Sequence, residues 1–147
     1  MLIPGFRSRG AIRVFGDGWS ERVQSFTPAA LAATLDQLEQ LTGVGIPSLT
    51  HAIIVLGREN DRRLTDSGRE RLWTAFRVPA FEQIIGEDQM LLARECEAHD
   101  GLHIESAKLT IAPQRIDHSE CGCGRKTPRL IFEERPEVIR RLAAYAR

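Results

Sequence analysis

The cysteines constrain this chain more than any other feature of its sequence. The 147 residues include three cysteines, and two of them, Cys121 and Cys123, are separated by a single glycine. An odd number of clustered cysteines does not fit a framework of paired disulfides. It fits a group of reduced thiols around a metal ion. The sequence therefore predicts one metal site in a compartment that keeps thiols reduced.

Two short segments supply the donors of this site. Cys96 and His99 are separated by two residues and followed by Asp-Gly, a turn that places both side chains near one ion, and Cys121 and Cys123 form the second pair. Zinc takes four nitrogen or sulfur ligands in a tetrahedron, and thiolates favour it over magnesium or calcium. We therefore predict that Cys96, His99, Cys121 and Cys123 hold Zn²⁺ in a closed, structural site rather than a catalytic one.

Other ligand sets remain open at this stage. His118 precedes Cys121 by three residues and His103 lies near His99, so either histidine would serve as the fourth donor in place of His99. The local, turn-bounded spacing from Cys96 favours His99. A different interpretation is that one cysteine is simply buried and that the Cys-Gly-Cys loop is merely flexible.

Composition and charge narrow the class of protein. Hydrophobic residues make up 42% and charged residues 27%, which suits one packed domain. Lys+Arg and Asp+Glu are both 20, so the chain lacks the electrostatic footprint of a nucleic-acid or anionic-membrane binding protein. No apolar run approaches the roughly 18 residues of a membrane span, and no signal peptide is evident. We expect a cytoplasmic protein without a membrane partner.

Hydrophobic periodicity predicts an α/β or α+β fold with one mixed β-sheet and flanking helices. Residues 1–26 are expected to form a β-hairpin with strands at 11–15 and 19–26, and residues 27–88 an α/β crossover unit. In that unit we expect a helix from Thr27, a buried strand at 51–56, a helix from Thr65 or Ser67, and a strand at 80–85.

The last third of the chain is expected to be a zinc-clipped β region at 89–132, followed by a helix at 133–147. Its strands are predicted at 90–96, 102–104, 108–112 and 130–132. The helix is predicted to begin at Pro136, with Val138, Ile139, Leu142 and Tyr145 on one face.

A polar group follows two of the predicted strands. Arg58 and Glu59 come after the strand at 51–56, while Glu87 and Asp88 come after the strand at 80–85. Open α/β sheets bind ligands at the carboxyl ends of their strands, so these four residues form a candidate ligand-binding site. The alternative is a solvated rim of ordinary loop residues.

Two sequence blocks resemble a known family. Residues 95–104 (ECEAHDGLHI) and 121–130 (CGCGRKTPRL) are similar to segments of phenylacetate–coenzyme A ligase-like, adenylate-forming enzymes. The resemblance covers about residues 27–132. It implies a sub-lobe of the adenylate-forming core and a nucleotide or carboxylic-acid ligand. It also places both halves of the metal site in one scaffold, which favours His99 as the histidine ligand.

The departures from the family pattern bear on activity. Residues 84–88 (IIGED) lack the aromatic residue and the hydroxyl of the family's nucleotide motif, and no phosphate loop precedes residues 56–59. Adenylation needs the phosphates of ATP to be clamped by such a loop, a lysine and Mg²⁺. We expect a zinc-binding, non-catalytic accessory or binding protein that pairs with a protein partner or a second copy of itself.

Two alternatives to this function are kept. A small enzyme, or a nucleotide- or acyl-acid-binding protein, would reuse the polar group after the strands. A zinc-ribbon-like nucleic-acid module would use Arg125, Lys126 and Arg129 beside the cysteines. The zero net charge and the lack of aromatic residues between these basic residues count against a nucleic-acid partner.

Overall fold

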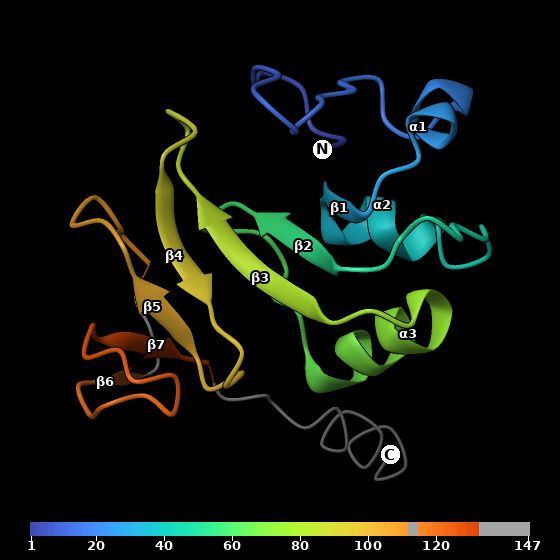
Figure 1. Cartoon of the computed structure of the whole chain (residues 1–147). Helices are drawn as coiled ribbons and strands as arrows, with labels where there is room; N and C mark the ends of the chain where they lie inside the picture. The colour runs from blue at the N-terminus through green and yellow to red at the C-terminus, as the bar shows by residue number, and fades with distance from the viewer. Residues whose placement is uncertain (112–114, 133–147) are drawn as a thin grey trace, which may run out of the picture.

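The computed structural model describes residues 1–111 and 115–132, and its centre is one seven-stranded mixed sheet (Figure 1). The strand order is β1-β2-β3-β4-β5-β7-β6. The strands are β1 (Ala30–Ala33), β2 (Ala52–Gly57), β3 (Ala80–Ile85), β4 (Leu91–Glu95), β5 (Leu102–Ile104), β6 (Arg115–Asp117) and β7 (Arg129–Ile131). The helices are α1 (Glu21–Phe26), α2 (Leu35–Gln40) and α3 (Asp66–Phe76). This confirms the expected α/β class.

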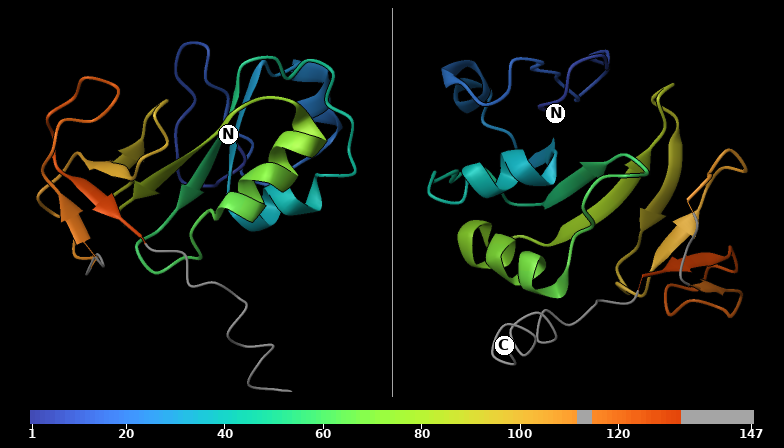
Figure 2. Two further views of the ribbon diagram at one scale, coloured as in Figure 1. Left: turned by 90° about the horizontal axis from the view of Figure 1, so that it is seen from below. Right: turned by 180° about the vertical axis from the view of Figure 1, so that it is seen from behind.

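The parallel half of the sheet contains β1, β2 and β3, which are connected through α2 and α3. Thr34 caps α2 in a capping box with Gln37, and Thr65 caps α3 by accepting a hydrogen bond from the Gly68 N–H at 3.1 Å. Apolar side chains of both helices share one buried cluster with Ile53 of β2. The right-hand view of Figure 2, seen from behind, shows these two helices in front of the strands.

The first 41 residues differ from the expectation in two places. Residues 21–26 form the short helix α1 instead of the return strand of a hairpin, and residues 11–15 form no strand. Residues 30–33 form β1, where a helix from Thr27 was expected. Leu31 and Ala33 are buried at alternate positions, which is strand periodicity. The helix starts later because Thr34 and Gln37 form the cap.

The antiparallel half contains β4, β5, β7 and β6, and encloses a second, smaller apolar cluster. The strand expected at 108–112 is not present at residues 108–111, and β6 at residues 115–117 forms the edge of the sheet instead. The expected C-terminal helix lies outside the described residues. Among the described helices, none has the length and apolar character needed to cross a membrane.

The N-terminal segment packs along β1 and contributes Leu2 and Val23 to the larger buried cluster. Its backbone joins the sheet edge where the Leu2 N–H donates to the Ala32 carbonyl at 2.8 Å. A cavity of about 630 Å³ remains between this segment and the sheet, lined by Phe15 and Phe26 on one side and by Ile54 on the other. The fold therefore places an apolar cavity at one end of the sheet and the cysteines at the other.

Candidate metal centre

The β4–β5 hairpin carries two of the four donor side chains. Cys96 follows the last residue of β4, and His103 is the central residue of β5. The two strands are antiparallel, with Arg94 opposite His103. Because side chains alternate along a strand, Cys96 and His103 face the same side of the hairpin. Both are buried, with exposed fractions of 7% and 0%.

The loop between β6 and β7 carries the other two donors. The Cys121 N–H donates to the Arg125 carbonyl at 3.0 Å, and the Gly124 N–H donates to the Cys121 carbonyl at 2.8 Å. Gly124 has φ +82°, a left-handed conformation that glycine adopts without steric cost. Within this tight loop Cys121 is buried and Cys123 is half-buried.

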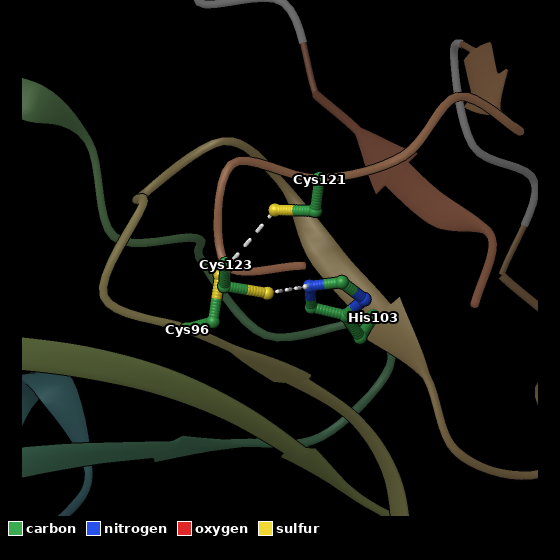
Figure 3. A group of neighbouring side chains, drawn as sticks. All are labelled: Cys96, His103, Cys121 and Cys123. Carbon is green, nitrogen blue, oxygen red and sulfur yellow. Dashed lines mark hydrogen bonds between the residues drawn. The ribbon is translucent and has the colours of Figure 1, made fainter. Parts of the chain in front are cut away.

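The four donor atoms converge on one point (Figure 3). The donor atoms of Cys96, His103, Cys121 and Cys123 all lie within 4.8 Å of one another. Cys96 Sγ is 3.6 Å from Cys121 Sγ, and Cys123 Sγ is 3.4 Å from His103 Nε2. A tetrahedral zinc ion requires about 3.8 Å between two sulfur ligands and about 3.6 Å between sulfur and nitrogen. The donor types and their spacing therefore fit a metal ion.

A hydrogen bond holds the imidazole of His103 in the orientation that a metal ligand needs. Its Nδ1 lies 2.7 Å from Thr127 Oγ1, which leaves Nε2 facing the thiols. Histidine ligands commonly engage their second ring nitrogen in this way, because the bond fixes the tautomer and the plane of the ring. Thr127 is thus part of the candidate metal centre, and the spacing of cysteines and histidines in the sequence does not indicate it.

The thiols differ in their affinity for protons. Burial raises the pKa of Cys96 to about 11, because the thiolate loses hydration. A hydrogen bond from the backbone N–H of Cys123 lowers the pKa of Cys121. Metal ions bind the thiolate, so a metal ion must displace the proton of Cys96, and affinity for the metal rises with pH below that pKa.

Arg129 ties together the two segments that hold the donors. It is 1% exposed, and its Nη1 donates to the Asp100 carbonyl at 2.9 Å and pairs with the Asp100 carboxylate. Its Nη2 pairs with Asp117 Oδ2 at 2.8 Å and donates to Ser119 Oγ at 3.1 Å. Asp100 belongs to the turn after Cys96, while Asp117 and Ser119 precede Cys121. The buried guanidinium of Arg129 therefore links the turn after Cys96 to the segment before Cys121.

The histidine of the cluster is His103, and this corrects the expected ligand set at one position. The three cysteines come together as expected, whereas His99 and His118 lie outside the group of converging donors. The alternation of side chains across the predicted hairpin was the signal that would have identified His103. The local spacing from Cys96 and the family resemblance favoured His99 instead.

His99 is excluded from the cluster by its place at the tip of the turn. It has φ +51°, beyond the end of β4. Its Nδ1 lies 3.0 Å from Glu95 Oε1, and its ring stacks on Phe81 with centroids 5.1 Å apart. These contacts turn the imidazole toward β3 rather than toward the thiols.

The polar group predicted after the parallel strands is largely engaged by the chain itself. Glu59 accepts hydrogen bonds from the Thr110 N–H at 2.5 Å, the Thr110 hydroxyl at 2.8 Å and the Ile111 N–H at 3.2 Å. Asp88 forms an ion pair with Lys108 at 2.8 Å. The segment at 108–111 is thus fastened beside the carboxyl ends of β2 and β3, where a ligand was expected.

The other two residues of that group show no assembled site. The Arg58 N–H donates to Asp61 Oδ2 at 2.7 Å, which closes the loop after β2, and the Arg58 side chain is exposed. Glu87 is exposed in the turn after β3. The geometry of these residues matches a solvated rim more closely than a binding site.

Comparisons with known proteins give a likeness of fold. No family model matches the chain, and no curated protein does. Among solved structures, an open conformation of 2-hydroxyisobutyryl-CoA ligase in complex with 2-HIB-AMP and CoA is similar, with a TM-score of 0.55 and 13% sequence identity. The match covers 75% of this chain and 34% of that chain, so this chain spans about a third of that enzyme. The described fold therefore resembles part of an adenylate-forming enzyme.

Proposed function

We propose that this protein is a zinc-binding, non-catalytic accessory or binding protein of the cytoplasm, built on a phenylacetate–CoA ligase-like adenylate-forming scaffold. The observation that carries the proposal is the convergence of three thiols and His103 Nε2 within 4.8 Å. Four protein donors fill the tetrahedral coordination of zinc and leave no position for a substrate. The ion would clip the β4–β5 hairpin to the loop before β7.

The non-catalytic part of the proposal is supported by the carboxyl ends of β2 and β3. Adenylation would require this edge to accept ATP and Mg²⁺. Glu59 instead accepts hydrogen bonds from Thr110, and Asp88 pairs with Lys108. Two carboxylates suited to polar ligands are thereby committed to the chain's own backbone and side chains.

Two measurements on the purified chain test the proposal. Elemental analysis is expected to give one zinc per chain. Pyrophosphate exchange with a panel of carboxylic acids is expected to give no signal above a blank. Exchange activity would overturn the non-catalytic role, and a chain free of transition metal after expression with added zinc would overturn the clip. Light scattering would distinguish a homodimer from a monomer that awaits a different partner.

A second candidate function is the binding of a small carboxylic acid in the cavity under the N-terminal segment. Its volume of about 630 Å³ falls within the range of small-molecule sites, and its lining includes aromatic side chains, the Gln83 amide and Arg13. Isothermal titration with short aryl and alkyl carboxylic acids tests this candidate. Saturable binding that Arg13→Gln weakens is expected, and equal binding by the variant would reject it.

The nucleic-acid alternative has little support from the metal centre. Arg125 pairs with Glu105 at 3.2 Å, and Arg129 is buried against Asp117. Two of the three basic residues that suggested this function are therefore neutralised by carboxylates. A gel shift at low salt with random DNA and RNA is expected to show no complex.

A further inference from the structure

The three cysteines of the candidate metal centre differ in their exposure to solvent. Cys96 and Cys121 are buried, with exposed fractions of 7% and 3%, whereas Cys123 is half-buried. Cysteine ligands of a metal ion are thiolates, and a thiolate is oxidised where an oxidant can reach it. A small oxidant from solvent therefore meets Cys123 before the other two cysteines.

A second thiol lies close enough to Cys123 to form a disulfide with it. The sulfurs of the three cysteines all lie within 4.8 Å of one another, and Cys96 Sγ is 3.6 Å from Cys121 Sγ (Figure 3). The two sulfurs of a disulfide are about 2.05 Å apart, so movements of less than about 3 Å, shared by two side chains, are enough to form the bond.

The geometry favours Cys96 as the partner of Cys123. Cys121 and Cys123 are separated by one residue, in a turn that the Gly124 N–H closes onto the Cys121 carbonyl at 2.8 Å. A disulfide across so short a ring is strained. Cys96 approaches from a different segment, which lies directly against the loop: a methyl group placed on Gly122 would be 3.6 Å from the Cβ of Ala98.

Contacts that involve no sulfur hold these two segments together. Arg129 pairs with Asp100, in the turn after Cys96, and with Asp117, which precedes Cys121. These ion pairs do not depend on the oxidation state of the cysteines. The thiols therefore stay within reach of one another while the ligand set is being oxidised.

We propose that hydrogen peroxide exchanges the metal clip for a disulfide clip, by oxidising Cys123 and cross-linking it to Cys96. This inference rests on the zinc clip proposed above. In the first step the Cys123 thiolate attacks one oxygen of peroxide, the O–O bond breaks, and a sulfenic acid and hydroxide form. In the second step the Cys96 thiolate attacks the sulfenic sulfur, the S–O bond breaks and a second hydroxide leaves. Two electrons pass from the two sulfurs to peroxide.

The disulfide takes over the structural role of the metal ion. Cys121 and His103 are the two donors that remain, too few for a structural zinc site, so zinc is released. The new covalent bond still joins the β4–β5 hairpin to the loop before β7, and it restricts the unfolded chain. Release of zinc by peroxide is therefore separated from unfolding of the β4–β7 half.

Oxidation of the zinc-loaded chain with hydrogen peroxide tests this inference. Trypsin places Cys96 in the peptide 95–108 and the other two cysteines in the peptide 116–125, so a link between the segments appears as a joined pair of peptides. We expect this pair, together with a loss of about 2 Da per chain and release of one zinc to a chromogenic chelator. A disulfide confined to residues 121–123, or zinc release without a disulfide, would overturn the proposal.

Thermal melting tests the structural role of the disulfide. The oxidised, zinc-free chain is expected to melt about 5 °C or more above the reduced chain treated with chelator, because a cross-link between distant positions stabilises the fold. Equal melting temperatures would show that the disulfide does not replace the clip.

Two measurements test the entry of peroxide at Cys123. Dimedone, which traps sulfenic acids, is expected to label Cys123 in the unaltered chain, and label on Cys96 or Cys121 instead would overturn this step. Cys121→Ser and Cys123→Ser form a matched pair, since each removes one donor and leaves two thiols. At saturating zinc we expect Cys121→Ser to form the cross-link about tenfold faster, because both thiols left in Cys123→Ser are buried. Equal rates would contradict the role of Cys123.

Zinc content separates this inference from the clip on which it rests. A chain without zinc after expression with added zinc would overturn both. A chain that holds one zinc but gives no link between the two tryptic peptides would keep the clip and overturn the exchange. Dithiothreitol is expected to restore the thiols and the binding of one zinc, and failure to do so would show oxidation beyond the disulfide.

Discussion

At the scale of single residues, His99 and His103 are four positions apart in the sequence and have different surroundings. His103 is fully buried in β5, with Thr127 on Nδ1 and Cys123 near Nε2. His99 lies in the turn and is bound to Glu95. The difference arises from the pairing of β4 with β5, which turns one imidazole toward the thiols and leaves the other on the outside.

Substitution of each histidine tests this assignment. His103→Asn is expected to lower zinc content well below one per chain and to weaken zinc affinity by 10-fold or more, about the loss seen when a metal-site contact is removed. His99→Asn is expected to retain one zinc. Inductively coupled plasma mass spectrometry after dialysis against a weak chelator measures both. Loss of zinc in His99→Asn alone would restore the ligand set expected from spacing.

Arg129 is the residue whose removal should disturb the centre without touching a ligand. Arg129→Met keeps much of the buried volume but leaves Asp117 Oδ2 and the Asp100 carbonyl without the guanidinium donor. We expect the free energy of unfolding to fall by about 1–3 kcal/mol, because the hydrogen bonds of the buried guanidinium are lost while its carboxylate partners keep some contact with water. Urea denaturation at saturating zinc measures the change. Arg125→Met, which removes an exposed pair, is the control and is expected to cost about 1 kcal/mol or less.

At the scale of elements, β3 joins the two halves of the sheet, because it pairs in parallel with β2 and antiparallel with β4. This strand carries a buried acid, Glu82. Glu82 is 5% exposed, accepts a hydrogen bond from the Leu64 N–H at 3.3 Å and lies 3.5 Å from Arg63. Burial raises the pKa of Glu82 above its ordinary value of 4.5, and the nearby Arg63 opposes this in part. The carboxylate form therefore carries a net penalty in the fold.

The pH dependence of stability follows from the direction of that shift. Between pH 4.5 and the raised pKa of Glu82, the folded chain binds more protons than the unfolded chain, so stability falls as pH rises through this window. Glu82→Gln removes this contribution. We expect the stability of the variant relative to the parent to improve from pH 4 to pH 7, as measured by urea denaturation. A constant difference across that range would contradict the raised pKa.

The start of α2 provides a second test at this scale. Thr34 accepts a hydrogen bond from the Gln37 N–H, and the Gln37 side chain accepts from the Thr34 N–H at 3.0 Å. Thr34→Ala is expected to lower the free energy of unfolding by about 1 kcal/mol through loss of this cap. Thr27→Ala is expected to change it far less, since Thr27 follows α1 and caps no helix start. A larger effect at Thr27 would favour the helix expected from the sequence.

At the scale of the whole molecule, the sheet joins two apolar cores of unequal size. The larger surrounds β1 to β3 with α2 and α3, while the smaller consists of Ile84, Leu92, Ala93, Leu102 and Leu130. Short strands and a small core contribute limited burial to the β4–β7 half. A metal clip is a physical means of stabilising such a half.

Removal of the metal should therefore affect the two halves differently. On addition of a strong chelator we expect hydrogen-exchange protection to be lost at residues 91–95, 102–104 and 129–131, and to persist at residues 53–56. The melting temperature should fall at the same time, because metal binding is coupled to folding. Uniform loss of protection would show that the two halves unfold as one cooperative unit. Unchanged protection would show that a metal ion does not stabilise the β4–β7 half.

Local signals in the sequence predicted the features that depend on neighbouring residues. Periodicity predicted the buried runs that form β2 and β3, and spacing predicted the convergence of the cysteine segments. Thr65 was one of two expected starts of α3, and the structure places the cap there. The expected hairpin at 1–26 failed because residues 21–26 also suit a helix and the choice depends on packing. The strand expected at 108–112 failed because residues 108–111 bind Glu59 and Asp88 instead of a strand neighbour.

The sequence by itself indicated that three thiols and a histidine would meet, since an odd, clustered set of cysteines fits a metal site better than a framework of disulfides. It also determined an α/β sheet with flanking helices. The tertiary structure decided which histidine joins the thiols, because that choice depends on strand register and on the competing attraction of Glu95 and Phe81 for His99. Spacing along the chain carries no information about such long-range pairings, whereas the folded sheet sets them directly.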